Sequence, residues 1–182
     1  ANPFMGVDDL KLHKINGGWH QYGERAIAVR FTVYATIIQC RNWLPDEIGG
    51  LVWFALDNVA SSVYVPIYAS VSDVPAPYKN CGRKTGFSRE AAWWAFNRVG
   101  TLAAQRWGDM RKNVENTWKP FQKQLIDNQK NIENQALSIY NEKKTAKTID
   151  FLTKYTIEQA NIALKLAWDL GDEIWTQYDE KW

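Results

Sequence analysis

The sequence predicts an α+β fold in which an antiparallel sheet is followed by three helices. From residue 26 to about residue 70, the chain is rich in β-branched and aromatic residues and is broken by short turns, which is typical of strands. After residue 88, apolar residues recur at spacings of three and four, which is typical of amphipathic helices. The 182 residues suffice for a single unit with its own core. We therefore expect one unit over 1–182, with an irregular first segment at 1–25, strands within 26–70 and helices within 88–182.

Three stretches carry the predicted strands. Residues 26–41 contain no glycine or proline and are rich in Val, Ile, Thr and aromatic residues, so they form one strand or two strands divided by a bend. Residues 51–56 are apolar throughout, which predicts a buried central strand. Residues 62–68 contain Pro66, which cannot donate to a ladder and so marks an edge or a strand end. The short connections predict an antiparallel meander.

Capping residues and breakers set the expected ends of the three helices. Ser88 can cap the first helix, because its hydroxyl can accept a hydrogen bond from a free backbone N–H. Asp109 can cap the second helix, which Pro120 must kink or interrupt. Thr145 or Thr148 opens the third helix, whose apolar stripe runs nearly to the C-terminus.

Charge and composition exclude several classes of protein. The formal net charge is only +2, so binding to nucleic acid through a basic surface is not expected. No run approaches the roughly 18 apolar residues that a membrane span requires, and the first residues show no signal peptide. The two cysteines, Cys40 and Cys81, are too few for a disulfide scaffold and too far apart for a Cys-x-x-Cys motif.

Several short segments occur in a fixed order along the chain. They are Asn2-Pro3-Phe4-Met5-Gly6, Glu24-Arg25-Ala26-Ile27, Gln39-Cys40-Arg41, Trp43 to Trp53 with its Pro-x-Glu-Ile-Gly-Gly-x-x-Trp block, Ser62 to Tyr68, Phe87 to Asn97, and Gly171-Asp172-Glu173 before the aromatic tail near Tyr178. Their order and content resemble the latter half of the dipeptidases of peptidase family C69.

This resemblance implies an N-terminal-nucleophile hydrolase, built as an αββα sandwich, that cleaves dipeptides with an N-terminal cysteine. In that mechanism the cysteine's own α-amino group serves as the base. The first residue of this chain is Ala1, and Cys40 and Cys81 lie inside the chain, so neither can act in this way. We therefore expect a C-terminal portion of such an enzyme, whose main partner is the upstream, N-terminal half. By itself this portion should not hydrolyse peptides.

Two arginines are the candidates for substrate binding. Arg25 and Arg41 flank the longest strand region, and a guanidinium fork suits the carboxylate of a dipeptide. The simpler interpretation is that each arginine pairs with a neighbouring acidic residue, namely Glu24, Asp46 or Glu47. No catalytic residue is predicted within this chain.

Cysteine and histidine do not add a further predicted site. Cys40 lies within a predicted strand, with no histidine nearby in the sequence, so we expect a buried thiol that packs as a small apolar side chain. His13 and His20 follow Asp8 and Asp9, but their spacing fits no compact metal motif. We therefore expect no metal and no other cofactor.

Two other functions are compatible with the sequence. A non-catalytic binding or scaffold protein would retain the half-fold without the nucleophile. The ten tryptophans also allow a carbohydrate-binding protein, which would present exposed, coplanar Trp pairs. The compartment and the oligomeric state, including a homo-oligomer, stay open.

Overall fold

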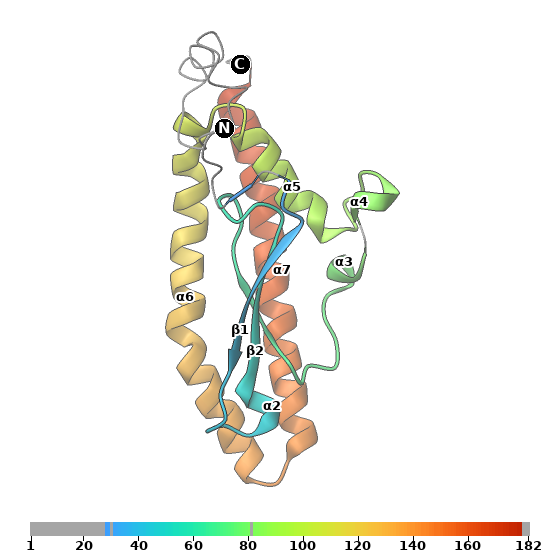
Figure 1. The fold of residues 1–182 in the computed structure, drawn as a ribbon, viewed down its shortest axis with the longest axis vertical. Coiled ribbons are helices and arrows are strands. Elements are labelled where there is room, and N and C mark those ends of the chain that lie inside the picture. The colour runs from blue at the N-terminus through green and yellow to red at the C-terminus, as the bar shows by residue number, and fades with distance from the viewer. Residues whose placement is uncertain (1–27, 30, 81, 180–182) are drawn as a thin grey trace.

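The computed structural model describes residues 28–29, 31–80 and 82–179, and it confirms the predicted α+β class (Figure 1). A three-stranded antiparallel sheet lies along two long helices, and a third helix packs at one end. The expected irregular segment at 1–25 lies outside the described residues, as do Arg25, His13, His20 and Cys81.

The sheet is a meander with the strand order β1-β2-β3. Its strands are β1 (Tyr34–Cys40), β2 (Gly50–Leu56) and β3 (Val65–Tyr68). A single turn of helix, α2 (Asp46–Gly49), connects β1 to β2. The central position of β2 and the edge position of β3, which contains Pro66, are as predicted.

The central strand is fully buried on one face only. Leu51, Trp53 and Ala55 are buried, whereas the alternating positions between them are partly exposed. Because successive side chains of a strand point to opposite faces, this alternation means that one face of the sheet is covered and the other is not. The expectation of a strand buried on both faces is therefore met on the covered side alone.

Three long helices follow the sheet, as predicted, with boundaries that differ from the expected ones. They are α5 (Ala92–Ala103), α6 (Trp107–Asn141) and α7 (Thr145–Tyr178), after the short helices α3 (Ala76–Lys79) and α4 (Gly82–Thr85). Ser88 accepts a hydrogen bond from the Glu90 N–H in the turn before α5 and is not its N-cap. Helix α6 begins before Asp109 and continues through Pro120.

Helices α6 and α7 form a hairpin along the sheet, and α5 packs on α7 (Figure 1). We call the sheet face toward this hairpin the inner face. Polar contacts join the layers: the Trp118 indole N–H donates to the Ser61 carbonyl at 2.9 Å, and the Thr156 hydroxyl donates to the Pro66 carbonyl at 3.3 Å. The core therefore lies between the inner face and the helices, with Phe96 stacked on Trp118.

The opposite face, which we call the outer face, is apolar and open. Gln39 bonds to Gln129 of α6 and so lies on the inner side, which places the alternating β1 positions on the outer side. The outer face consists of Tyr34, Thr36, Ile38 and Cys40 of β1, Gly50, Val52, Phe54 and Leu56 of β2, and Val65 and Ile67 of β3. It is open along β1, whereas Val65 of β3 is only 1% exposed. Tyr34 is 59% exposed and Ile38 67% exposed, although both are large apolar side chains.

Cys40 corrects a prediction, because its side chain is exposed and not buried. The strand that carries it is an edge strand, and none of the described residues forms a layer over its outer face. Strand membership alone therefore does not bury a residue. Among the helices of the described residues, none has both the length and the apolar character needed to cross a bilayer.

Candidate functional site

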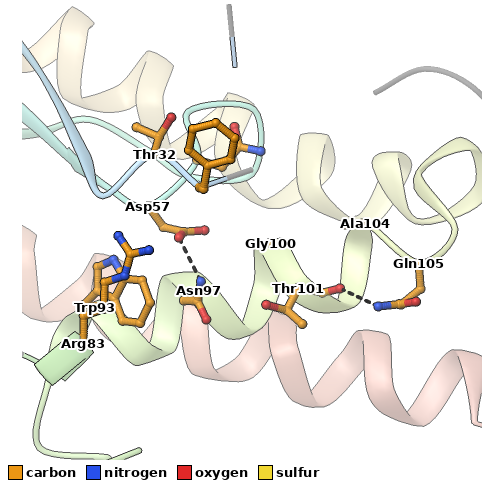
Figure 2. Close-up of a pocket in the computed structure, with 11 residues that line it drawn as sticks. Thr32, Asp57, Arg83, Trp93, Asn97, Gly100, Thr101, Ala104 and Gln105 are labelled. Atoms are coloured by element: carbon orange, nitrogen blue, oxygen red, sulfur yellow. Dashed lines mark hydrogen bonds between the residues drawn. The ribbon is translucent and has the colours of Figure 1, made fainter. Parts of the chain in front are cut away.

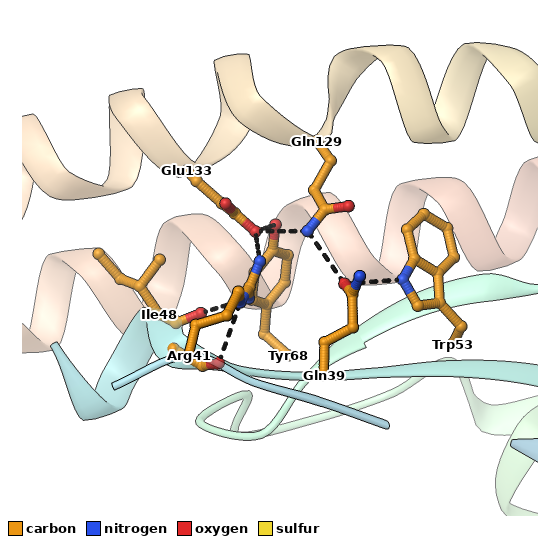
Figure 3. A network of polar contacts seen from close by, with 8 residues as sticks. Gln39, Arg41, Ile48, Trp53, Tyr68, Gln129 and Glu133 are labelled. Carbon is orange, nitrogen blue, oxygen red and sulfur yellow. Dashed lines mark hydrogen bonds and ion pairs between the residues drawn. The ribbon is translucent and has the colours of Figure 1, made fainter. Parts of the chain in front are cut away.

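Arg41, the one predicted substrate-binding residue that the structure describes, lies directly after β1 and is held by three protein groups (Figure 3). Its guanidinium pairs with the Glu133 carboxylate of α6 and donates to the carbonyls of Ile48 at 3.0 Å and Gly49 at 3.2 Å. The side chain is only 9% exposed. All three guanidinium nitrogens are thus engaged within the protein.

Glu133 is also the centre of a wider polar network on the inner face (Figure 3). The Gln129 amide donates to Glu133 at 2.9 Å and to the Gln39 side-chain oxygen at 3.1 Å, and the Trp53 indole N–H donates to that same oxygen at 3.1 Å. The Tyr68 hydroxyl donates to Glu133 at 3.4 Å, and burial together with the Glu133 charge raises the pKa of Tyr68. The network therefore ties β1, β2 and β3 to α6.

This arrangement changes the simpler interpretation of Arg41. The expected acidic partners were Asp46 and Glu47, but the observed partner is Glu133, which is 92 positions away in the sequence. The contacts explain why an arginine is required at this position, since a planar fork reaches one carboxylate and two carbonyls at once. Binding of a substrate carboxylate by Arg41 or by Arg25 stays a prediction.

A separate pocket of about 240 Å³ lies between the end of β2 and helices α4 and α5 (Figure 2). Its polar wall is formed by Asp57, which follows β2, by Asn97 and Thr101 of α5, and by Arg83 of α4. The indole ring of Trp93 forms an aromatic wall. The pocket thus brings together opposite charges and an aromatic ring.

Asp57 has the most unusual environment of these residues. It is 2% exposed, and its backbone adopts a left-handed conformation with φ of 63°, which aspartate tolerates better than most residues. The Asn97 amide donates to its carboxylate at 2.9 Å. Burial raises the pKa of the Asp57 carboxyl, and the hydrogen bonds from the Asn97 side chain and the Asn58 backbone, with the nearby Arg83 charge, partly oppose that effect. Asp57 is thus a carboxylate whose charge is poorly compensated.

Gly100 allows this carboxylate to pack against α5. A Cβ at position 100 would lie 2.6 Å from an Asp57 carboxylate oxygen and 2.9 Å from the Ser61 hydroxyl, which are distances that real Cβ atoms do not reach. The absence of a side chain at Gly100 therefore fixes how closely Asp57 approaches the helix.

Trp93 and Arg83 line the pocket beside Asp57 (Figure 2). The Arg83 guanidinium carbon lies 5.9 Å from the centre of the Trp93 ring, within the range of a cation–π contact. The Trp93 indole N–H is buried and has no hydrogen-bond partner within the described residues. Trp94 meets Trp93 edge-on at 74°, so this pair is not the coplanar platform that a carbohydrate-binding protein would present.

The sequence pattern alone does not single out this pocket. Asp57 and Asn58 predict only a break between strands, and Arg83 lies in a loop-like stretch of the sequence. An Asp-Asn pair directly after a strand does signal a left-handed residue. Its proximity to Asn97, 40 positions away, depends on how α5 packs against the sheet. No cluster of potential metal ligands occurs among the described residues.

Comparisons with known proteins identify the family. The model of peptidase family C69 matches residues 12–120, which is more than half of the chain, and so the chain belongs to peptidase family C69. Among curated proteins, it is 27% identical over 151 residues to a protein of Lactococcus lactis subsp. lactis (strain IL1403) named "Probable dipeptidase B", an alignment that covers 73% of this chain. It is also 23% identical over 99 residues, or 54% of this chain, to the "Probable dipeptidase B" of Streptococcus pyogenes serotype M1.

The matched relatives are much longer than this chain. The alignments cover 31% of the Lactococcus protein and 17% of the Streptococcus protein. The chain thus spans about a third or less of the length of these curated relatives.

Proposed function

We propose that this chain is the C-terminal portion of a cysteine dipeptidase of the N-terminal-nucleophile type. The observation that carries the proposal is the match to peptidase family C69 over residues 12–120, together with relatives whose names include the word dipeptidase. The small share of those relatives that the chain covers supports the assignment to a portion. The proposed substrates are dipeptides.

The nucleophile of this enzyme would lie on a segment upstream of Ala1. An N-terminal cysteine supplies both a thiolate and a free α-amino group that can take up the thiol proton, so the attack on the peptide carbonyl needs no other base. Ala1 has no thiol, and Cys40, although exposed, has its amino group within the backbone. The role of the present chain would be to form one sheet layer and one helical layer of the enzyme.

The outer face of the sheet supports a partner on this side. Its positions in β1, β2 and β3 carry no charged residue, and its two large β1 side chains, Tyr34 and Ile38, are mostly exposed. Large apolar side chains that are exposed side by side in this way mark an interaction site. We assign the upstream portion of the same enzyme to this face, where a second sheet would complete a layered sandwich.

Expression of the chain with and without its natural upstream segment tests the proposal. The longer protein, processed to an N-terminal cysteine, should hydrolyse dipeptides such as Ala-Ala, and replacement of that cysteine by alanine should abolish the activity. The 182-residue chain alone should show no hydrolysis. Hydrolysis by this chain alone, or no hydrolysis by the processed longer protein, would contradict the proposal.

A non-catalytic scaffold is the second candidate function. The observation that favours it is the commitment of Arg41 to Glu133, Ile48 and Gly49, which leaves this predicted ligand of the substrate engaged in structural contacts. A longer protein that folds, covers the outer face and has no N-terminal cysteine would support this function over the dipeptidase.

A further inference from the structure

The pocket beside Asp57 presents a negative group and a positive group to one small cavity. Asp57 supplies a buried carboxylate, and Arg83 supplies a guanidinium on an exposed side chain. Figure 2 shows both side chains at the same end of the pocket, with Trp93 behind Arg83. Arg83 is close enough to influence the charge of Asp57, yet no ion pair is formed between the two side chains. A ligand can therefore be placed against both charges.

The size and the walls of the pocket restrict what it can hold. Its volume of about 240 Å³ is below the range of about 300–1,000 Å³ that is usual for drug-sized ligands, so it suits a small molecule. The Trp93 indole N–H is a buried donor without a partner among the described residues, and such a donor has an unmet need for an acceptor. The nitrogen itself is not accessible from the cavity, so the recognition of a ligand rests on Asp57 and Arg83.

We propose that this pocket binds a small zwitterion with a free α-ammonium group and a free carboxylate. The ammonium group would lie against Asp57, and the carboxylate would lie against Arg83. This is the chemistry of a free amino acid and equally of a dipeptide. That the zwitterion is the substrate or the product of peptide hydrolysis rests on the function proposed above, whereas the existence of the site does not.

The local contacts favour an ammonium group at Asp57 over a neutral ligand. One carboxylate oxygen accepts the Asn97 amide, which fixes the group while leaving acceptor capacity on the carboxylate. Burial removes the Asp57 carboxylate from water and is the largest influence on its charge. A cation bound beside this carboxylate would therefore be stabilised strongly. Arg83 is better suited than a lysine to the other end, because its fork can hold a carboxylate while the guanidinium lies over the Trp93 ring.

Calorimetry with four small probes tests the proposal on the 182-residue chain. L-alanine and L-alanyl-L-alanine are the zwitterions, N-acetyl-L-alanine lacks the ammonium group, and L-alaninamide lacks the carboxylate. We expect saturable binding of at least one zwitterion, and each single-charge analogue of alanine should bind about tenfold or more weakly than alanine if alanine is the ligand. Whichever of alanine and alanylalanine binds with the higher affinity shows whether the site takes an amino acid or a dipeptide. If the dipeptide binds more tightly, its N-acetylated and amidated forms replace the analogues of alanine.

Two variants assign each charge to its residue. Arg83→Gln should bind the zwitterion more weakly and should no longer distinguish it from the amidated analogue. Asp57→Asn, which keeps a residue that tolerates the left-handed backbone, should no longer distinguish it from the N-acetylated analogue. Arg89→Gln is the matched control, because Arg89 is an exposed arginine that stacks on Trp168 outside the pocket. It should bind like the wild type.

The outcomes separate this proposal from the dipeptidase proposal. Absence of binding by the folded wild-type chain, or binding that is indifferent to removal of either ligand charge, would overturn the zwitterion site. The zwitterion site would also be overturned if Arg89→Gln weakened ligand binding as much as Arg83→Gln does. Dipeptide hydrolysis is measured on the longer protein and can succeed or fail independently. If Asp57→Asn does not fold, the blocked analogues and Arg83→Gln still decide the question.

Discussion

The two faces of the sheet have similar residues and opposite surroundings. On the inner face, Leu51 and Trp53 are almost fully covered by the helical layer. On the outer face, Ile38 and Tyr34 are equally apolar but mostly exposed. The neighbouring layer and the position within the sheet together determine which apolar residues are buried. Ile37, on the inner face of the edge strand β1, is 51% exposed, and Val65, on the outer face of β3, is 1% exposed. We infer that the layer over the outer face belongs to the rest of the enzyme.

The largest expected difference between the two sides concerns core truncation. Phe96 is 1% exposed and stacks on Trp118 with ring centres 6.0 Å apart, so Phe96→Ala should lower the free energy of unfolding by about 3–5 kcal/mol. Ile38→Ala on the outer face should change it by only about 0.5 kcal/mol in this chain. Urea denaturation of the two variants measures both values. Similar losses for both would contradict the difference between the faces.

An intermediate effect is expected at the polar network that joins the sheet to α6. Arg41→Lys keeps the charge near Glu133 but removes donors from the carbonyls of Ile48 and Gly49, so the free energy of unfolding should fall by about 1–3 kcal/mol. Lys154→Gln, at an exposed ion pair with Asp150, is the control and should cost less than about 1 kcal/mol.

The same Arg41→Lys variant tests the predicted role in substrate binding. In the longer enzyme, loss of a carboxylate contact should lower kcat/KM by an amount equivalent to about 2 kcal/mol, in addition to the loss of stability predicted above. A variant that melts earlier and retains its kcat/KM would instead assign Arg41 to structure alone.

The smallest expected effect is a pH dependence at Asp57. Burial raises the pKa of this carboxyl above its usual 3.8, so the folded state holds the proton more tightly than the unfolded state. The stability contributed in this way is present below pH 3.8 and is lost as the pH rises through the raised pKa of the folded state. The wild type should therefore lose stability relative to Asp57→Asn as the pH rises to neutrality.

Melting temperatures measured across that pH range check this prediction. Asp150→Asn, at an exposed carboxylate that pairs with Lys154, is the control for general effects of pH on the fold. A constant difference between wild type and Asp57→Asn at every pH would contradict the shifted pKa.

Elements could be predicted from the sequence where their local residue pattern agrees with their surroundings in the fold. The apolar run of β2 and the position of Pro66 in an edge strand were both predictable from local rules. Thr145 does open α7, as the pattern allowed. Pro120 does not interrupt α6, which leaves the predicted kink as the remaining alternative. Its neighbours Trp118 and Phe121 are buried in the core, and their packing supports α6 across a residue that lacks an N–H donor.

The parts that local rules could not predict depend on distant neighbours. Cys40 is exposed because no described residue covers the outer face of its edge strand, whereas the usual burial of free cysteine gave the opposite expectation. The partner of Arg41 is Glu133 on α6, which no spacing near Arg41 indicates. The pocket needs Asp57, Arg83 and Asn97 together, and only the packing of α4 and α5 at the end of β2 places them around one cavity.

The rate at which Cys40 reacts with a thiol reagent tests most directly the claim that the rest of the enzyme covers the outer face. Labelling can be read at the Cys40 peptide by mass spectrometry, which separates it from Cys81 and from any upstream cysteine. In the folded 182-residue chain, Cys40 should react about as fast as an exposed thiol. In the longer protein, the reaction should be on the order of tenfold slower or more. Equal rates in the two proteins would contradict the claim.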